Sequence, residues 1–374
     1  MSIPVISSYY NRLNFSANTL NNILPSILNF PSKRFKHYAL LNNRGLIRIK
    51  GDDSTKFLHG IVTNNVEKNK ENVLYADLLT NKGRVICDSF IYKIEKDNEE
   101  APEYLLDVDK SLVPFLLKYL KRYKLRSDIH LFNASKNLNV WSVWKSDNET
   151  NENVQKDLEN IGIITAKDPR CCAMGFRVVG KSLEDSDIFS KSIKQTEDDY
   201  KIKRILNGIP EGPFEIIKSS SFPFEANLDF LNGVDYHKGC YIGQELTYRT
   251  HKRGTIRKRL VPVQLYKEGE SEPEKLAVNT QWEKTVVAPG TKLTPCQTEE
   301  AQNRIKNVFR DGIYNIGMAL VNVDLFKQGE KKTTLFSINL NNDNNNNNNS
   351  KIYAKAFLPD FIDLTKKEEN KTEN

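Results

Sequence analysis

Apolar residues are spaced in strand and helix patterns from Gly45 onward, and these patterns predict a first module. Apolar and charged residues alternate at 45–50 as in a half-buried strand, and the apolar spacing at 57–62 is that of a helix. Two β-rich runs, 73–79 and 84–94, follow around Asn81-Lys82-Gly83, whose Asn and Gly permit the positive φ of a tight hairpin turn. A strand, an amphipathic helix and a closing strand are predicted at 103–108, 112–123 and 129–132. The order β-α-β-β-β-α-β predicts a ferredoxin-like antiparallel sheet covered by helices.

The rest of the chain divides into a second module and an all-β region. Strand-like segments at 140–144 and 174–179, a polar loop at 145–160 and a helix around 200–206 predict another α/β module. After Gly254, four strand-like segments predict a small β-barrel: 256–265, 285–293, 313–323 and 333–340. Two polar stretches interrupt this region: acidic residues at 268–275, and an asparagine tract at 341–349 that has no apolar group to bury.

The predicted fold class is therefore α+β, with two ferredoxin-like modules and a C-terminal barrel. The expected boundaries are 1–36 for a leader, 37–135 with 200–255 for the first module, 136–199 for the second, 256–366 for the barrel, and 367–374 for a polar tail. A chain of 374 residues is too long for one compact domain, in agreement with this division. No run of about eighteen apolar residues occurs, which argues against a membrane span.

Charge is distributed unevenly along the chain. The net charge of +7 equals the balance of the first 51 residues, which contain seven Lys or Arg and no acid, so the remainder is neutral. A neutral body is not expected of a general nucleic-acid binder, although a local patch stays open. Residues 1–36 combine basic charge with Ser, Asn and apolar residues, and they indicate a mitochondrial presequence and a matrix location. A disordered polar leader is the alternative.

Five cysteines and five histidines are scattered along the chain, and they exclude several site classes. An odd cysteine count without a C-x-x-C pair argues against a disulfide scaffold or a self-contained zinc site. Neither an H-E-x-x-H helix nor a Walker loop is present. Cys171 and Cys172 are adjacent, and neighbouring side chains of an extended segment point to opposite faces, so we expect structural roles rather than chelation.

The segment 238–254 carries the most chemistry. Gly239 and Gly243 bracket Cys240, so the backbone can approach a ligand or another chain closely, and Cys240 is expected to lie exposed at a bend. Lys238, Arg249 and other cations should favour its thiolate, the form that ligates metals or attacks electrophiles. Gly243, Gln244 and Glu245 indicate a helix start. The plainer alternative is a small buried cysteine, and the chemistry alone leaves the two in balance.

The run Lys238-Gly239-Cys240-Tyr241-Ile242-Gly243-Gln244-Glu245 resembles the K-G-C-[FY]-x-G-Q-E signature of the YgfZ-type folate-binding proteins. These are relatives of the glycine-cleavage T-protein, and the likeness is strongest to their mitochondrial iron-sulfur cluster assembly branch. Four further segments are similar to family motifs and extend the resemblance from about Gly45 to Leu320: 57–64, 82–85, 208–211 and 223–229. The resemblance implies a three-domain ring of two ferredoxin-like domains and a barrel around a central hole that holds folate.

The chain also departs from the family pattern. Asn65 replaces an expected acid and His59 an expected Gln, and the T-protein's catalytic carboxylate has no counterpart that a motif assigns. The resemblance nonetheless implies folate-binding residues, of which Glu225 is expected at the pterin ring, with Asn227 close by. The basic cluster 249–259, which includes Arg257, is expected to form a solvated barrel strand or to bind the glutamate carboxylates of folate.

The resemblance implies a matrix factor for iron-sulfur cluster assembly, chiefly of the four-iron kind. Cys240 would be a transient cluster ligand shared with A-type carrier proteins or client iron-sulfur enzymes, Lys238 and Arg249 would keep it ionised, and Gly239, Tyr241, Gly243, Gln244 and Glu245 would shape the partner contact. Tetrahydrofolate is an expected cofactor. The alternative is a tetrahydrofolate-dependent aminomethyl transferase, which needs a carboxylate base and no thiol. RNA binding is the weakest hypothesis, because the basic cluster lacks interleaved aromatic residues on which bases could stack.

Overall fold

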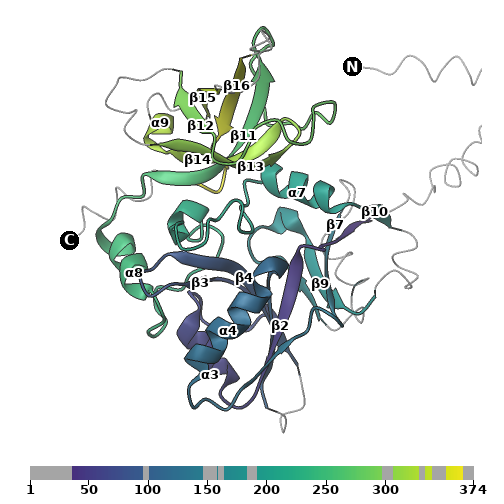
Figure 1. The fold of residues 1–374 in the computed structure, drawn as a ribbon, viewed down its shortest axis with the longest axis vertical. Helices are drawn as coiled ribbons and strands as arrows, with labels where there is room; N and C mark the ends of the chain where they lie inside the picture. The colour runs from purple at the N-terminus through teal and green to yellow at the C-terminus, as the bar shows by residue number, and fades with distance from the viewer. Residues whose placement is uncertain are drawn as a thin grey trace, which may run out of the picture.

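A computed structural model describes most of the chain beyond residue 35. The described residues are 36–95, 101–145, 158, 164–182, 192–296, 306–327, 333–338 and 351–364. Residues 1–35 of the predicted leader, most of the polar loop 145–160, the asparagine tract 341–349 and the tail 367–374 lie outside the described residues. In the part that is described, the fold is mixed α+β with three sheets, the last of which closes into a barrel (Figure 1).

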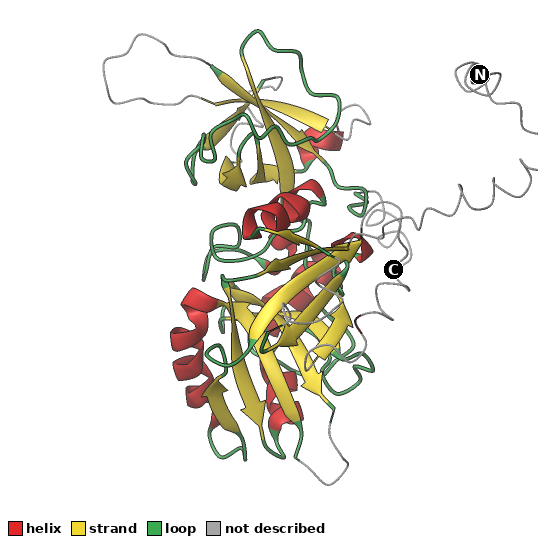
Figure 2. Cartoon of the chain, turned by 90° about the vertical axis from the view of Figure 1, so that its right-hand side faces the viewer, coloured by secondary structure: helices red, strands yellow, loops and turns green. Residues whose placement is uncertain are grey.

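The first sheet has five antiparallel strands in the order β3-β4-β5-β2-β6. Its strands are β2 (Arg44–Lys50), β3 (Val73–Leu79), β4 (Val85–Ile94), β5 (Glu103–Asp109) and β6 (His130–Asn133). Two helices, α3 (Ser54–Ile61) and α4 (Val113–Lys124), lie against one face of this sheet (Figure 2), and the short turn η1 (Lys110–Leu112) leads into α4. Their apolar faces share one buried cluster with the sheet, which is what the helical spacing of the sequence predicts.

The second sheet also has five strands, in the order β10-β1-β7-β9-β8. Its strands are β1 (Lys36–Leu40), β7 (Asn139–Lys145), β8 (Ile164–Lys167), β9 (Phe176–Gly180) and β10 (Ile193–Gln195). The chain therefore enters the second sheet through β1 before it builds the first one. A shared apolar cluster joins the two sheets, because Tyr75 and Phe90 of the first pack with Trp144 and Val179 of the second.

The third sheet is a closed barrel with the strand order β11-β14-β13-β12-β15-β16. Its strands are β11 (Lys258–Lys267), β12 (Lys292–Pro295), β13 (Asn307–Ile313), β14 (Ile316–Asn322), β15 (Thr333–Ile338) and β16 (Ile352–Phe357), and α9 (Asp324–Lys327) follows β14. The helix α7 (Glu197–Leu206) lies between the barrel and the two sheets (Figure 1). Thr196 and Asp199 form a capping box that fixes its start.

Three short elements complete the fold and lead to the motif segment. They are η2 (Cys172–Met174), η3 (Pro223–Ala226) and α8 (Gln244–Arg253). Two expectations for the barrel are wrong. The run 285–293 is mostly loop and enters a strand only at Lys292. The run 313–323 begins at the end of β13 and continues as β14, because Tyr314 takes a positive φ of 55° at the hairpin between them.

Candidate functional site

Cys240 lies exposed in a short loop that is held from both sides. The loop has no regular secondary structure and leads into α8 at Gln244. On one side, the backbone N–H of Ile242 donates to Gly60 O at 3.1 Å, which attaches the loop to the last turn of α3. The exposed bend predicted for Cys240 is thus present, and its sulfur is not sealed in the core.

Lys238 fixes the start of this loop. Its ammonium donates to the backbone carbonyls of His59 at 2.6 Å, Val62 at 2.6 Å and Asn64 at 2.8 Å. These carbonyls lie at and just beyond the end of α3, where the helix leaves its own acceptors unpaired. Burial lowers the pKa of Lys238 to about 7, against the opposing effect of Asp235. All three ammonium protons are thus directed to the backbone, and the effect of Lys238 on the thiolate of Cys240 stays a prediction.

Gly243 fixes the other end of the loop against the β3–β4 hairpin. Its φ is +81°, and a Cβ there would lie 2.3 Å from Thr80 O. Gly83, at the tip of the hairpin, has φ +73°, and its Cβ would lie 2.9 Å from Gly243 O. Only glycine permits both the conformation and this backbone contact. The two glycine motifs of the sequence therefore form one structural unit, whereas a Cβ on Gly239 would make only an ordinary contact, 3.6 Å from His59 Nε2.

The remaining motif residues line a surface pocket beside the loop. The pocket has a volume of about 450 Å³ and is lined by Asn81, Tyr241, Gly243, Gln244, Glu245 and Tyr248. Tyr241 is buried in the apolar cluster that links the sheet to the barrel, and burial raises the pKa of its hydroxyl to about 12. Gln244 is hydrogen-bonded to Tyr241, because its backbone N–H donates to Tyr241 O at 3.3 Å. Glu245 is exposed in the first turn of α8, as the sequence predicts.

Arg249 and its basic neighbours lie on a helix. Arg249, Lys252 and Arg253 are exposed on α8, and the helix ends at Gly254. The expectation that the cluster 249–259 is a barrel strand is therefore wrong for its first half. A strand begins only at Lys258, because 244–253 continues the helix that Gly243 and Gln244 start.

The residues predicted to bind folate are engaged in different ways within the protein. Glu225 caps η3, since its Oε2 accepts from Phe222 N at 3.0 Å. Asn227 is fully buried, and its amide donates to Leu260 O at 2.7 Å while its oxygen accepts from Arg259 at 3.2 Å. Arg257 is exposed just before β11. Asn227 is buried and bonded within the protein, so it offers no exposed group to a pterin, and folate binding by Glu225 and Arg257 stays a prediction.

Arg259 explains much of the 223–229 motif. Its guanidinium donates to Phe224 O at 2.8 Å and forms a two-pronged pair with the Asp229 carboxylate at 2.9 and 2.8 Å. Arg259 belongs to the first barrel strand, whereas Asp229 follows η3. The motif therefore ties the barrel to the body of the protein.

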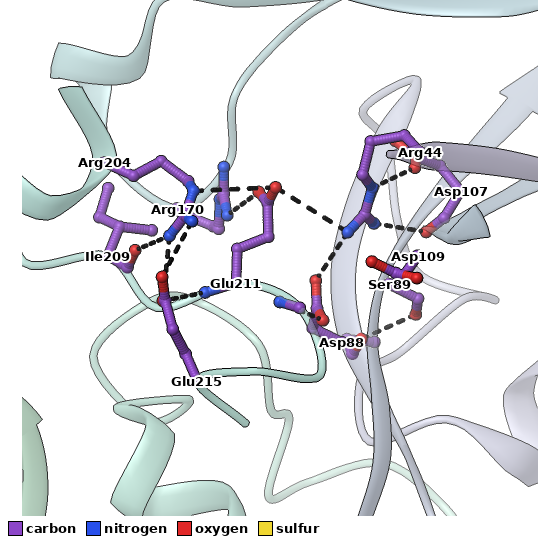
Figure 3. A network of polar contacts seen from close by, with 12 residues as sticks. Arg44, Asp88, Ser89, Asp107, Asp109, Arg170, Arg204, Ile209, Glu211 and Glu215 are labelled. Atoms are coloured by element: carbon purple, nitrogen blue, oxygen red, sulfur yellow. Dashed lines mark hydrogen bonds and ion pairs between the residues drawn. The ribbon is translucent and has the colours of Figure 1, made fainter. Parts of the chain in front are cut away.

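A buried ionic network, which no sequence pattern indicated, joins the two open sheets. Figure 3 shows the part of this network around Arg44 and Glu211. Glu211 Oε2 accepts from Arg170 at 2.7 Å and from the Tyr200 hydroxyl at 2.8 Å. Arg177 of β9 reaches Asp107 of β5 at 2.6 Å. The other ionic members are Arg44, Asp88, Asp168, Arg204 and Glu215. Burial alone would raise the pKa of Glu211, but the guanidinium groups around it outweigh burial and hold it well below its ordinary value.

One buried carboxyl lies apart from these pairs. Asp77 is fully buried in β3, and neither carboxyl oxygen has a hydrogen-bond partner among the described residues. It stands opposite Asp88 in the β3–β4 register. Burial, and then the Asp88 charge, raise the pKa of Asp77 well above its ordinary value. A mid-strand Asp in the run Leu-Tyr-Ala-Asp-Leu-Leu was the signal that could have indicated this group.

The cysteines and ligand-type side chains restrict metal chemistry. All five cysteines are free, as predicted. Cys172 begins η2, so the two cysteines do not share one extended segment as expected, and their structural roles stay a prediction. Within the described ranges no three His, Cys, Asp or Glu side chains gather to hold a metal ion. In the same ranges, no helix is long and apolar enough to cross a membrane.

The chain was compared with known proteins. No protein-family model matches it. Three curated relatives are each named "Iron-sulfur cluster assembly factor IBA57 homolog, mitochondrial". The Mycosarcoma maydis protein is 31% identical over 303 residues, covering 76% of this chain and 73% of the relative. The Neosartorya fischeri protein is 36% identical over 316 residues, covering 77% of this chain and 70% of the relative. The Pyricularia oryzae protein is 32% identical over 341 residues, covering 87% of this chain and 84% of the relative.

A solved structure supports the fold. The glycine cleavage system aminomethyltransferase T from Bartonella henselae superposes with a TM-score of 0.60 at 11% sequence identity, covering 88% of this chain and 86% of that one. An identity this low supports a shared fold and carries no statement about activity. The two ferredoxin-like modules of the sequence prediction correspond to two five-stranded open sheets, and the predicted C-terminal barrel is confirmed.

Proposed function

The chain belongs to the IBA57 family of iron-sulfur cluster assembly factors, and on that premise we propose that it matures four-iron cluster proteins in the mitochondrial matrix. The observation that carries the proposal is the exposed Cys240 thiol on a loop fixed at Lys238, Ile242 and Gly243. The basic, acid-free leader 1–36 supports delivery to the matrix.

The proposed role of Cys240 is to share a cluster with a partner. Thiolate is the ligand that iron-sulfur clusters prefer, and a single thiolate cannot hold a cluster. The described residues offer no group of three ligands, so the proposal takes the remaining ligands from a partner protein or from a second copy of the chain. We assign that part to A-type carrier proteins and to client iron-sulfur enzymes. The cluster is cargo in this scheme, and the chain contributes one sulfur and a surface.

The motif around Cys240 suits transient access. Gly239, the residue before Cys240, is exposed, and apart from its chain neighbours a methyl group there would meet only His59. Gln244 and Glu245 line the neighbouring pocket at the start of α8, where a partner's side chain could be received. Arg249, exposed on α8, is proposed to add positive charge to the helix that follows the loop. The loop is therefore proposed as a rigid platform with one reactive atom at its tip.

The test is anaerobic mixing with an A-type carrier that holds a cluster. The wild-type protein is expected to give a complex whose visible circular dichroism and EPR spectra differ from those of the carrier alone. Cys240→Ser should abolish the spectral change. Cys296→Ser is the matched control, because Cys296 is also exposed but lies on the barrel. An unchanged spectrum on mixing, or an equal change with the Cys240→Ser protein, would refute the shared-ligand role.

Tetrahydrofolate remains part of the proposal only as a ligand to be tested. Glu225 and Asn227 are used within the protein, so no step of the proposed function passes through folate. Equilibrium dialysis against tetrahydrofolate would measure binding directly. Formation of methylene-tetrahydrofolate from a methylamine donor would favour the alternative function, an aminomethyl transferase, whereas its absence would favour the assembly factor.

A further inference from the structure

Three elements around the Cys240 loop expose basic side chains. We define a cationic band by Lys82 on the β3–β4 turn, Lys118, Lys121 and Arg122 on α4, and Arg249 and Lys252 on α8, all of them exposed. Between residues 110 and 127 the sequence has six Lys or Arg and no acid, and Glu245 is the one acid within α8. A neutral body thus carries a local positive surface beside the proposed site.

Several contacts link the elements that carry this band to the Cys240 loop. The Tyr119 hydroxyl of α4 donates to Leu79 O at 3.1 Å, at the end of β3. Gly243 closes on the same place, since its Cβ would lie 2.9 Å from Leu79 Cβ. Ile242 packs against the apolar cluster that holds the buried face of α4. The Cys240 loop and α4 are therefore attached at the same end of β3, beside the hairpin turn and the start of α8.

Apolar side chains are exposed along the same surface. Leu125 directly follows α4, is 85% exposed and has a φ of +48°, a conformation that costs energy in a residue with a side chain. Phe115, at the start of the helix, is also exposed, with the Lys218 ammonium 3.1 Å from its ring centroid. Apolar residues within a charged rim are typical of protein contact surfaces.

We propose that the cationic band is the docking surface for an acidic face of the cluster-carrying partner. The inference rests on the proposed function, and it adds the chemistry by which the partner is recognised. Opposite charges steer association and fix its orientation, so the partner would arrive with its cluster over Cys240. An anionic membrane fits less well, because a bilayer on this surface would cover the loop, and the apolar side of α4 is already packed in the core.

The test measures association of the wild-type protein and two variants with the A-type carrier. One variant carries Lys118→Glu, Lys121→Glu and Arg122→Glu, and the other replaces the same residues by Gln. The matched control carries Lys275→Glu, Lys292→Glu and Lys306→Glu, which make the same charge change on exposed residues of the barrel region. Thermal unfolding monitored by circular dichroism confirms that each protein is folded.

The association rate of the wild-type protein should fall steeply with salt. The Glu variant should lower the rate about tenfold or more at low salt and flatten the salt dependence, the Gln variant should lie between, and the barrel control should match the wild type. Equal rates for all four proteins, with a Cys240-dependent cluster still shared, would overturn this inference and leave the proposed function intact. Loss of the shared cluster in the wild type would overturn the proposed function instead. A further outcome would assign the band to a membrane and refute the inference. In that case the wild type, but not the Glu variant, would sediment with anionic phospholipid vesicles, and both would associate equally with the carrier.

Discussion

Glu211→Gln should be among the most damaging single changes that preserve side-chain shape. The wild-type carboxylate accepts from Arg170 at 2.7 Å and from Tyr200 at 2.8 Å, and it lies 4.0 Å from both Arg44 and Arg177. An amide would keep the volume but remove the charge that compensates these guanidinium groups. Breaking a buried pair by removing one partner costs about 3–5 kcal/mol, and we expect a loss of that size at pH 7.

The loss should depend on pH with a definite sign. The folded pKa of Glu211 lies well below its ordinary value, so its contribution is present above the unfolded pKa, about 4.3 for a free Glu, and is lost as pH falls. The difference between the wild type and Glu211→Gln should therefore be constant from pH 6 to 7. Below the unfolded pKa it should shrink by about 1.4 kcal/mol per pH unit.

Urea denaturation followed by far-ultraviolet circular dichroism at pH 7, 5 and 3.5 would measure both effects. Glu274→Gln is the control, because Glu274 is exposed, and its free energy of unfolding should change by less than about 0.5 kcal/mol. A cost below about 1 kcal/mol for Glu211→Gln at pH 7 would contradict the assignment of Glu211 as the centre of the network. A difference that does not shrink at pH 3.5 would contradict the ionised state.

Two further predictions concern buried groups near the loop. Asp77→Asn should become more stable relative to the wild type as pH rises, by about 1.4 kcal/mol per pH unit from pH 4 until Asp77 ionises. The reason is that burial and Asp88 raise the folded pKa of Asp77, so only the wild type must retain a proton there. Parallel urea titrations of the two proteins that show no such trend would refute this prediction. Lys238→Met should lower the free energy of unfolding by about 2–4 kcal/mol, because three buried carbonyls lose their donor. Lys252→Met, an exposed change, should leave the free energy of unfolding unchanged, and an unchanged melting temperature in Lys238→Met would disprove the anchoring role.

Local sequence patterns correctly predicted the elements that are determined by their own apolar spacing or turn residues. The helix that contains Leu116 and Leu120 and the hairpin around Gly83 lie where periodicity and turn chemistry place them. The strands β1, β8, β10 and β16 were not predicted. The strand β1, for example, directly follows the leader and is paired by residues more than 100 positions away, so no nearby pattern reports its partner.

The site was predictable where the motif fixes the backbone and unpredictable where a side chain's direction decides. The flanking glycines and charges predicted an exposed Cys240 but left a buried cysteine as an equal alternative, and the structure shows that Cys240 is exposed. The inward direction of Lys238 and Arg259 does not follow, because a basic residue between polar neighbours suggests solvent rather than buried carbonyls. Glu211 stands in the motif segment 208–211, yet Arg44, Arg170 and Arg177 reach it from distant segments.

These contacts change how the motif 238–245 should be interpreted. Lys238 and Tyr241 point inward, and Gly243 is fixed by backbone contacts, so these positions build the platform. Cys240 and the adjacent Gly239 are the exposed positions of the loop and are left to meet a partner. Loss of function in a variant at 238, 241 or 243 can therefore arise through the fold alone. Only a variant at 239 or 240 that keeps the wild-type free energy of unfolding reports on the chemistry of the sulfur, and for that reason Cys240→Ser is the substitution on which the proposed function depends.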